Sequence, residues 1–222
     1  SCGAAGGRLP GQGIGHAGAS YQNSSLAKLG ELGSRLPPMP SQATWQAGSN
    51  VEVGWTLRAQ HGGGYSYRLA PADAPLTEET FRKIHVDFVG QSFLRWDGNR
   101  STQIAFNATR VSTGTMPVGS TWTMNPIPRA PYQWDEEGPS HEPVCEESEA
   151  CKATTLSGDA FAFCRCSGNP VNLEIVDVLK IPADIKPGKY VLGWRWDCEE
   201  TDQVWAACSD VTVTANTATV QV

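Results

Sequence analysis

The last third of the chain alternates bulky apolar residues with small or polar ones, which restricts it to extended structure. The stretch "GKYVLGWRWD" follows a proline and places an apolar side chain at every second position: Tyr190, Leu192, Trp194 and Trp196. Successive side chains of a strand point to opposite faces, so these four share one face and are expected to bury together. A second strand is predicted from Gln203 to Val213, which makes the pair an antiparallel hairpin.

Short strand patterns recur along the rest of the chain, separated by turn residues. They are "NVEVGWTLRAQ", "GYSYRLAP", "TQIAFNATRV", "STWTMNPI" and "NLEIVDVLKI". The segment "PLTEETFRKIHVDF" predicts a single short helix with Thr77 as its N-cap. Many short strands, one short helix and long loops predict an all-β fold, an antiparallel β-sandwich of immunoglobulin or fibronectin-III type with disulfide-stapled loops.

The chain length of 222 residues suits one β-sandwich domain, and we expect it to span 1–222. Residues 1–40 are rich in glycine and proline and are expected to wrap the core irregularly. Residues 129–170 form a long, acidic stretch that contains several cysteines, and we interpret it as a loop insertion.

Seven cysteines are many for a protein kept in a reducing compartment, so a disulfide framework is predicted. Cys198 and Cys208 flank the loop between the last two predicted strands, which favours a cross-strand disulfide between them. The odd count leaves one cysteine free, or paired with another chain or with residues upstream.

Three Asn-x-Ser/Thr sequences support the same compartment. They begin at Asn23, Asn99 and Asn107, and each is a candidate glycosylation site. The sequence therefore predicts a secreted, extracellular glycoprotein.

Charge and hydropathy exclude two classes of partner. The net charge of −6 argues against nucleic acid, which needs a basic surface. The chain has no run of 18 apolar residues, so no membrane-spanning helix is expected.

His61 is the histidine that most invites a chemical interpretation, because three glycines follow it directly. Small neighbours leave an imidazole uncrowded, as a metal ligand on an open surface requires. A glycine-rich hairpin that happens to begin with histidine explains the same residues equally well. A carboxylate pair for glycoside hydrolysis, drawn from Asp197, Glu199 and Glu200, is a more distant alternative.

Two ordered motifs resemble the lytic polysaccharide monooxygenases and the related chitin-binding type-4 proteins. They are "HGGGYSYRL" and the later pair "IPADIKPGKYVLGWRWD" and "QVWAACSDV". With "SCGAAGG", "LAKLGELG" and "TMNPIPR", they are similar to a set of secreted algal and protist members of this superfamily.

The resemblance implies a role for three residues. His61 would be the second copper ligand, and Gln203 the glutamine that hydrogen-bonds oxygen species near the metal. Trp205 stands where fungal members carry an axial tyrosine, and it would block that position without ligating. The family's first ligand is an N-terminal histidine, whereas this sequence starts Ser1-Cys2, so copper is expected only if a histidine precedes Ser1.

Two functions follow as expectations. The first is a secreted, copper-dependent monooxygenase that acts on an insoluble polysaccharide similar to chitin or cellulose. The second is a non-catalytic extracellular protein of the same fold, which binds carbohydrate or belongs to a cell-surface assembly.

Overall fold

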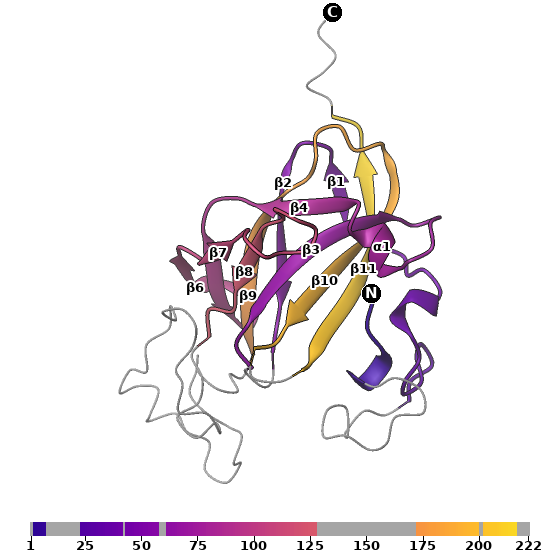
Figure 1. The fold of residues 1–222 in the computed structure, drawn as a ribbon, viewed down its shortest axis with the longest axis horizontal. Helices are drawn as coiled ribbons and strands as arrows, with labels where there is room; N and C mark the ends of the chain where they lie inside the picture. Colours follow the sequence, from indigo (N-terminus) through magenta and orange to yellow (C-terminus); the bar gives the residue numbers. More distant parts are fainter. Residues whose placement is uncertain are drawn as a thin grey trace, which may run out of the picture.

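The computed structural model of the 222-residue chain is built from β-strands in two layers, with α1 (Glu78–Phe81) at the side (Figure 1). The structure describes residues 2–7, 23–41, 43–57, 61–127, 172–199 and 202–216. The strands in these ranges are β1 (Thr44–Gln46), β2 (Asn50–Trp55), β3 (Gly64–Pro71), β4 (Ile84–Phe88), β5 (Ser92–Trp96), β6 (Asn99–Phe106), β7 (Arg110–Val111), β8 (Trp122–Met124), β9 (Leu173–Lys180), β10 (Gly188–Asp197) and β11 (Val204–Thr214).

The strands form two sheets that share one strand. The first sheet runs in the order β1, β11, β10, β3, with β8 and β7 added beside β3. The second contains β2, β9, β5 and β6. Strand β4 pairs first with β3 and then with β9, so it passes from one sheet to the other. All pairs except β1 with β11 are antiparallel, which confirms the predicted immunoglobulin-like β-sandwich.

The apolar core lies between the two sheets and is rich in aromatic rings. The four bulky residues predicted to share one face of β10 all pack in or against this core: Tyr190, Leu192, Trp196 and the partly buried Trp194. Arg195 and Asp197 lie on the opposite, outer face of the same strand, where they pair with each other. The predicted alternation along β10 is therefore confirmed.

The segment predicted as one helix is a single helical turn followed by a strand. Helix α1 ends at Phe81, and β4 begins at Ile84. Thr77 is the N-cap as predicted, and its side chain accepts a hydrogen bond from the backbone N–H of Thr80. The second half, "IHVDF", is extended because its apolar residues alternate with polar ones and because β3 and β9 supply pairing partners.

The stretch "TQIAFNATRV", predicted as one strand, is divided between the two sheets. Strand β6 ends at Phe106 and pairs with β5, whereas β7 begins at Arg110 and pairs with β8. The chain changes sheet between them, so one strand cannot continue. The alternation of apolar and polar residues also fails to predict β1 and β5, because strands of three and five residues contain few alternations.

The predicted disulfide between Cys198 and Cys208 is wrong, because Cys208 is bonded to Cys2 with their Cα atoms 5.1 Å apart. In the hairpin Cys208 lies opposite Gly193, while the strand continues to Asp197 before it reaches Cys198. At about 3.3 Å per residue this offset is roughly 15 Å, far beyond the reach of a disulfide. Cys2 instead attaches the N-terminal segment to β11.

The three candidate glycosylation residues, Asn23, Asn99 and Asn107, are exposed. The predicted insertion at 129–170 lies outside the described residues. The described parts of the predicted 1–40 wrap contain two short 3₁₀ turns, η1 (Ala5–Gly7) and η2 (Gly33–Arg35). Among the described residues, no helix is long and apolar enough to cross a membrane.

Candidate functional site

The glycines after His61 are explained by how closely two parts of the chain approach each other. They lie where β3 begins, beside the end of β10, at the lower end of the sandwich in Figure 1. Gly62 and Gly63 have φ angles of 62° and 75°, in the left-handed region that favours glycine. A Cβ on Gly63 would lie 2.0 Å from the carbonyl oxygen of Asp197, and one on Gly62 would lie 2.5 Å from Oε1 of Glu199. The space beside the glycines is therefore taken by the protein's own chain.

Three hydrogen bonds hold this turn in place. The indole Nε1–H of Trp196 donates to the carbonyl of Gly62 at 2.7 Å. The carbonyl of His61 accepts from the backbone N–H of Glu199 at 3.1 Å, and that of Gly63 accepts from Asn125 at 2.9 Å. The turn is therefore fixed by β10, by the residues after β10 and by the residues after β8.

The His61 imidazole is half-buried at this end of the sandwich. Its ring centroid lies 6.1 Å from that of Trp196, a core residue. Burial lowers the pKa of His61 below its usual value of 6.5, so the ring is neutral at neutral pH. Only a neutral imidazole has a nitrogen lone pair for a metal.

Gln203 and Trp205 lie at the same end, next to the turn. The backbone N–H of Cys198 donates to the carbonyl of Gln203 at 3.1 Å. The next residue along the chain is Glu199, whose backbone N–H donates to the carbonyl of His61. The indole Nε1–H of Trp205 donates to Oε1 of Gln203 at 3.0 Å and so orients the amide. Trp205 lies opposite Trp196 in the hairpin and packs against the core. The three residues that the sequence singled out thus belong to one cluster, which we call the His61 cluster (His61, Trp196, Gln203 and Trp205).

The described residues do not by themselves make a copper site. Among them, no group of three or more His, Cys, Asp or Glu side chains is placed to hold a metal ion. His85 lies on β4, where its Nε2 accepts a hydrogen bond from the backbone of Thr121 at 3.0 Å. His16 and His141 lie outside the described residues. The His61 cluster therefore offers one imidazole, and a copper ion would need further ligands.

The carboxylates near the turn give little support to glycoside hydrolysis. Both oxygens of Asp197 accept hydrogen bonds from the guanidinium of Arg195, at 2.5 and 2.8 Å. Both carboxylate oxygens of Asp197 are therefore already occupied by an ion pair within the protein. Glu199 is exposed, and Glu200 lies outside the described residues.

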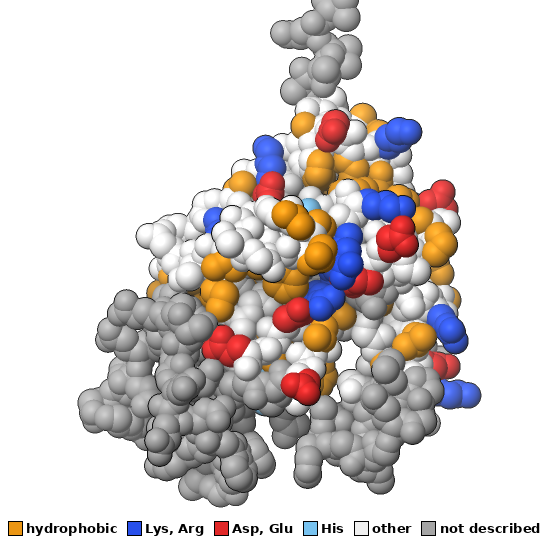
Figure 2. Space-filling model, viewed as in Figure 1, with side chains coloured by type: hydrophobic (Ala, Val, Ile, Leu, Met, Phe, Trp, Pro, Cys, Tyr) orange, Lys and Arg blue, Asp and Glu red, His pale blue; other side chains and the backbone are white. Residues whose placement is uncertain are grey.

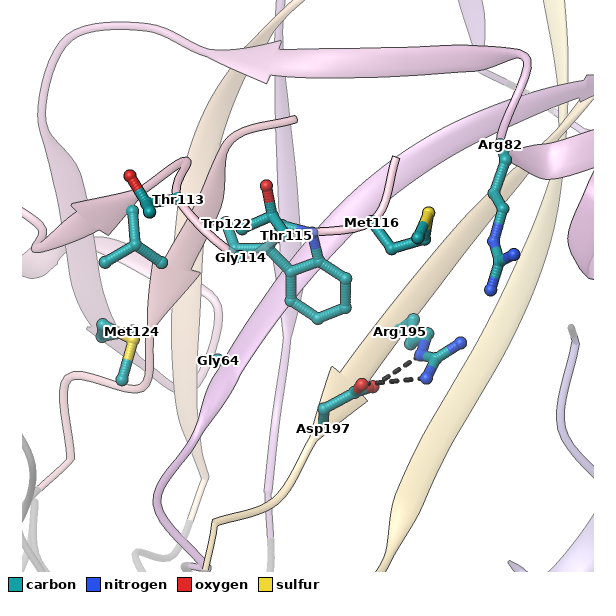
Figure 3. Close-up of a pocket in the computed structure, with 11 residues that line it drawn as sticks. Gly64, Arg82, Thr113, Gly114, Thr115, Met116, Trp122, Met124, Arg195 and Asp197 are labelled. Carbon is teal, nitrogen blue, oxygen red and sulfur yellow. Dashed lines mark hydrogen bonds and ion pairs between the residues drawn. The ribbon is translucent and has the colours of Figure 1, made fainter. Parts of the chain in front are cut away.

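A pocket of about 320 Å³ opens beside the turn, on the outer face of the first sheet (Figure 3). Gly64 and Asp197, which are paired at the ends of β3 and β10, line it next to the His61 cluster. Its other walls carry two guanidinium groups and an apolar surface: Arg82, Arg195, Val111, Met116, Trp122 and Met124. We call it the outer-face pocket.

No sequence pattern predicts this pocket, as two of its arginines show. Arg82 was placed inside a longer helix, whereas it follows the single turn of α1. The alternation along β10 puts Arg195 on the face opposite Trp194 and Trp196, but nothing in the sequence indicates that Glu78 of α1 meets it there, at 2.9 Å. Such a contact depends on tertiary structure, and no local pattern encodes it.

Comparison with solved structures finds lytic polysaccharide monooxygenases. One, from Thermobia domestica in the Cu(I) state, has 15% sequence identity and a TM-score of 0.37, and the match covers 77% of this chain and 62% of that one. A cellulose-active enzyme in complex with copper has 13% identity and a TM-score of 0.36, with 97% and 74% of the two chains covered. This chain thus spans less than two thirds of the length of the first. No family model and no curated protein matches the chain.

Proposed function

We propose that this chain is a secreted protein that acts on an insoluble polysaccharide, and that the His61 cluster is its functional site. The observation that supports the proposal best is the position of three residues: His61 lies far from Gln203 and Trp205 in the sequence, yet all three lie at one end of the sandwich. Because the motifs around them resemble those of copper-dependent monooxygenases, a copper monooxygenase acting on a chitin- or cellulose-like polymer is the activity we favour.

Each residue of the cluster has a physical role in this proposal. His61 presents a neutral imidazole on a turn that three hydrogen bonds hold rigid. Gln203 presents an amide whose oxygen is oriented by Trp205. The indole of Trp205 donates through nitrogen and has no oxygen with which to ligate, so it keeps that side of the site closed. Bound copper, completed by an N-terminal histidine, would supply the oxygen chemistry that cleaves a glycan.

The exposure of Asn23, Asn99 and Asn107 supports the secreted and glycosylated character of the protein. The disulfide between Cys2 and Cys208 is consistent with an oxidising compartment.

A second candidate is a non-catalytic carbohydrate-binding or structural glycoprotein of the same fold. One observation favours it: the described part of the His61 cluster holds a single imidazole, which is one ligand of the set that copper needs. Such a protein would bind a polysaccharide or join an extracellular assembly without cleaving the polymer.

The two candidates differ in what they release from a polymer. We expect the mature secreted protein, with copper and a reductant, to release oxidised oligosaccharides from insoluble chitin or cellulose, detected by mass spectrometry. His61→Ala should abolish release, because the imidazole is lost. His85→Gln is the matched control, because glutamine keeps an acceptor for Thr121 away from the cluster.

Binding to the polymer without any oxidised product would favour the non-catalytic candidate. Release that continues unchanged in His61→Ala would contradict the proposed role of the cluster.

A further inference from the structure

The outer-face pocket combines an apolar wall with a cationic one. Figure 3 shows the ring of Trp122 directed into the pocket, beside Met116. The indole Nε1–H of Trp122 donates to Oγ of Ser120 at 3.2 Å, so the ring offers its carbon surface to the pocket. Figure 2 shows hydrophobic side chains next to basic and acidic ones in the middle of this face. Met116 is 49% exposed and Val111 is 39% exposed, so the apolar wall is open to solvent.

Two guanidinium groups approach each other across this pocket. Figure 3 shows the side chains of Arg82 and Arg195 directed toward the same space, one from the turn after α1 and one from β10. Arg195 is engaged by both oxygens of Asp197 and, at 2.9 Å, by Glu78. The Arg82 side chain is 42% exposed, and its ion pair with Glu78 is long, at 3.6 Å. Arg82 therefore keeps hydrogen-bond donors that face solvent.

In the ion-pair network at this pocket, guanidinium groups outnumber carboxylates. Arg68 lies fully buried beneath it and also pairs with Glu78. The Nε and Nη2 atoms of Arg68 have no hydrogen-bond partner among the described residues. Three guanidinium groups thus share two carboxylates, Glu78 and Asp197. An arginine stays charged at all physiological pH values, so one positive charge is left over in a chain whose net charge is −6.

We propose that the outer-face pocket binds a sugar unit that carries a negative charge, either a carboxylate or a sulfate ester. The guanidinium of Arg82 is a planar fork that matches such an anion. The apolar face of the sugar ring packs on the exposed side chain of Met116 and on the part of the Trp122 ring that lines the pocket, since Trp122 is only 9% exposed. The volume of about 320 Å³ lies at the small end of ligand pockets and suits one or two rings.

A sugar fits these walls better than an acidic peptide, because the guanidinium of Arg82 faces the aromatic and apolar surface of Trp122 and Met116, on which the carbon face of a sugar ring can pack. The inference deepens the proposed function and rests on it: it names an acidic polysaccharide as the substrate class. Gly64 and Asp197 line the pocket and adjoin the His61 turn, so a polymer held in the pocket extends toward His61.

The test measures binding without metal or turnover. Titration calorimetry with EDTA compares three oligosaccharides of equal length: an oligogalacturonate, a sulfated carrageenan oligomer and a neutral cello-oligosaccharide. We expect one or both acidic oligomers to bind at least about tenfold more tightly than the neutral one, because a charge-assisted bond to arginine is added. The carboxylated and sulfated arms identify which anion is preferred, and the preference should weaken at high salt.

Variants locate the binding. Arg82→Gln should weaken binding of the preferred acidic oligomer about tenfold and leave binding of the neutral one unchanged. Arg100→Gln is the matched control, because it removes the same charge from an exposed residue on β6, in the other sheet. Met116→Glu should also weaken acidic binding, by placing a negative charge on the exposed apolar wall.

Three results would overturn the inference: no preference for acidic over neutral oligomers, equal binding by Arg82→Gln and Arg100→Gln, or a poly-glutamate peptide that binds as tightly as the acidic sugar. Release of oxidised products from chitin by a protein with no acidic preference would support the proposed function while contradicting this inference, so the two failures are distinguishable.

Discussion

At the scale of single residues, the glycines after His61 have a clear structural cause. Gly62 and Gly63 adopt left-handed φ angles and lie against Asp197 and Glu199. The interpretation as a loose hairpin underestimates this constraint, because the turn is fixed by three hydrogen bonds. The metal-ligand interpretation stays a prediction, and the rigid turn is what such a ligand would need.

Gly63→Ala should be strongly destabilising, because the new Cβ would lie 2.0 Å from a backbone oxygen at a φ of +75°. We expect a loss of roughly 3 kcal/mol in the free energy of unfolding, measured by urea denaturation. Gly119→Ala is the matched control: its φ is +79°, but nothing lies within 4 Å of the added Cβ. It should cost only about 1 kcal/mol. Equal losses for the two variants would show that the close approach to Asp197 is absent.

The buried carboxyl group of Asp177 should make the free energy of unfolding depend on pH. It accepts hydrogen bonds from Tyr65 at 2.9 Å and Ser92 at 2.6 Å, yet burial raises its pKa from 3.8 to about 6. The raised pKa means that the folded state binds the proton more tightly than the unfolded state. The stability from this group is therefore present below pH 3.8 and is lost as the pH rises through about 6.

This pH dependence can be measured by comparing the stability of the wild type with that of Asp177→Asn. The free energy of unfolding of the wild type minus that of Asp177→Asn should fall by about 2 kcal/mol between pH 4 and pH 7. Asparagine keeps an acceptor for one of the two bonds and does not titrate, so other carboxylates cancel in the difference. A difference that is constant over this range would contradict the raised pKa.

At the scale of elements, the disulfide between Cys2 and Cys208 joins two segments that are 206 residues apart in the sequence. Replacing Cys2 and Cys208 together with serine should lower stability by about 2–4 kcal/mol. Peptide mapping without reduction should recover a peptide pair linked through these two residues. Recovery of a Cys198–Cys208 pair in its place would contradict the structure.

Local sequence patterns predicted the elements whose own residues contain the whole signal. The alternation in β10, the N-cap at Thr77 and the strand "GYSYRLAP" were all predictable, because the signal lies within each segment. The helix over 75–88 was wrong because its second half takes its conformation from pairing with β3 and β9. The partner of Cys208 was unpredictable for a similar reason, since spacing along the chain says nothing about a contact with residue 2.

At the scale of the whole molecule, the first sheet brings the turn at His61 and the segment that contains Gln203 and Trp205 to one end of the sandwich. The sequence alone predicted the sandwich and suggested His61, Gln203 and Trp205 through a family resemblance. The structure adds the contacts that link them through Trp196, Cys198 and Glu199, and it adds the outer-face pocket beside the turn. The pocket could not be predicted, because Glu78 and Arg195 meet only when α1 folds onto the outer face of β10.

We claim that His61 is a copper ligand of the proposed functional site, and a measurement of copper affinity tests this role. Copper(II) should be titrated into the mature secreted protein with its natural N-terminus, into His61→Ala and into His85→Gln. We expect tight binding by the wild type and by His85→Gln, and an affinity at least about 100-fold lower for His61→Ala, because a ligand is lost. Equal affinity in His61→Ala and the wild type would contradict the claim.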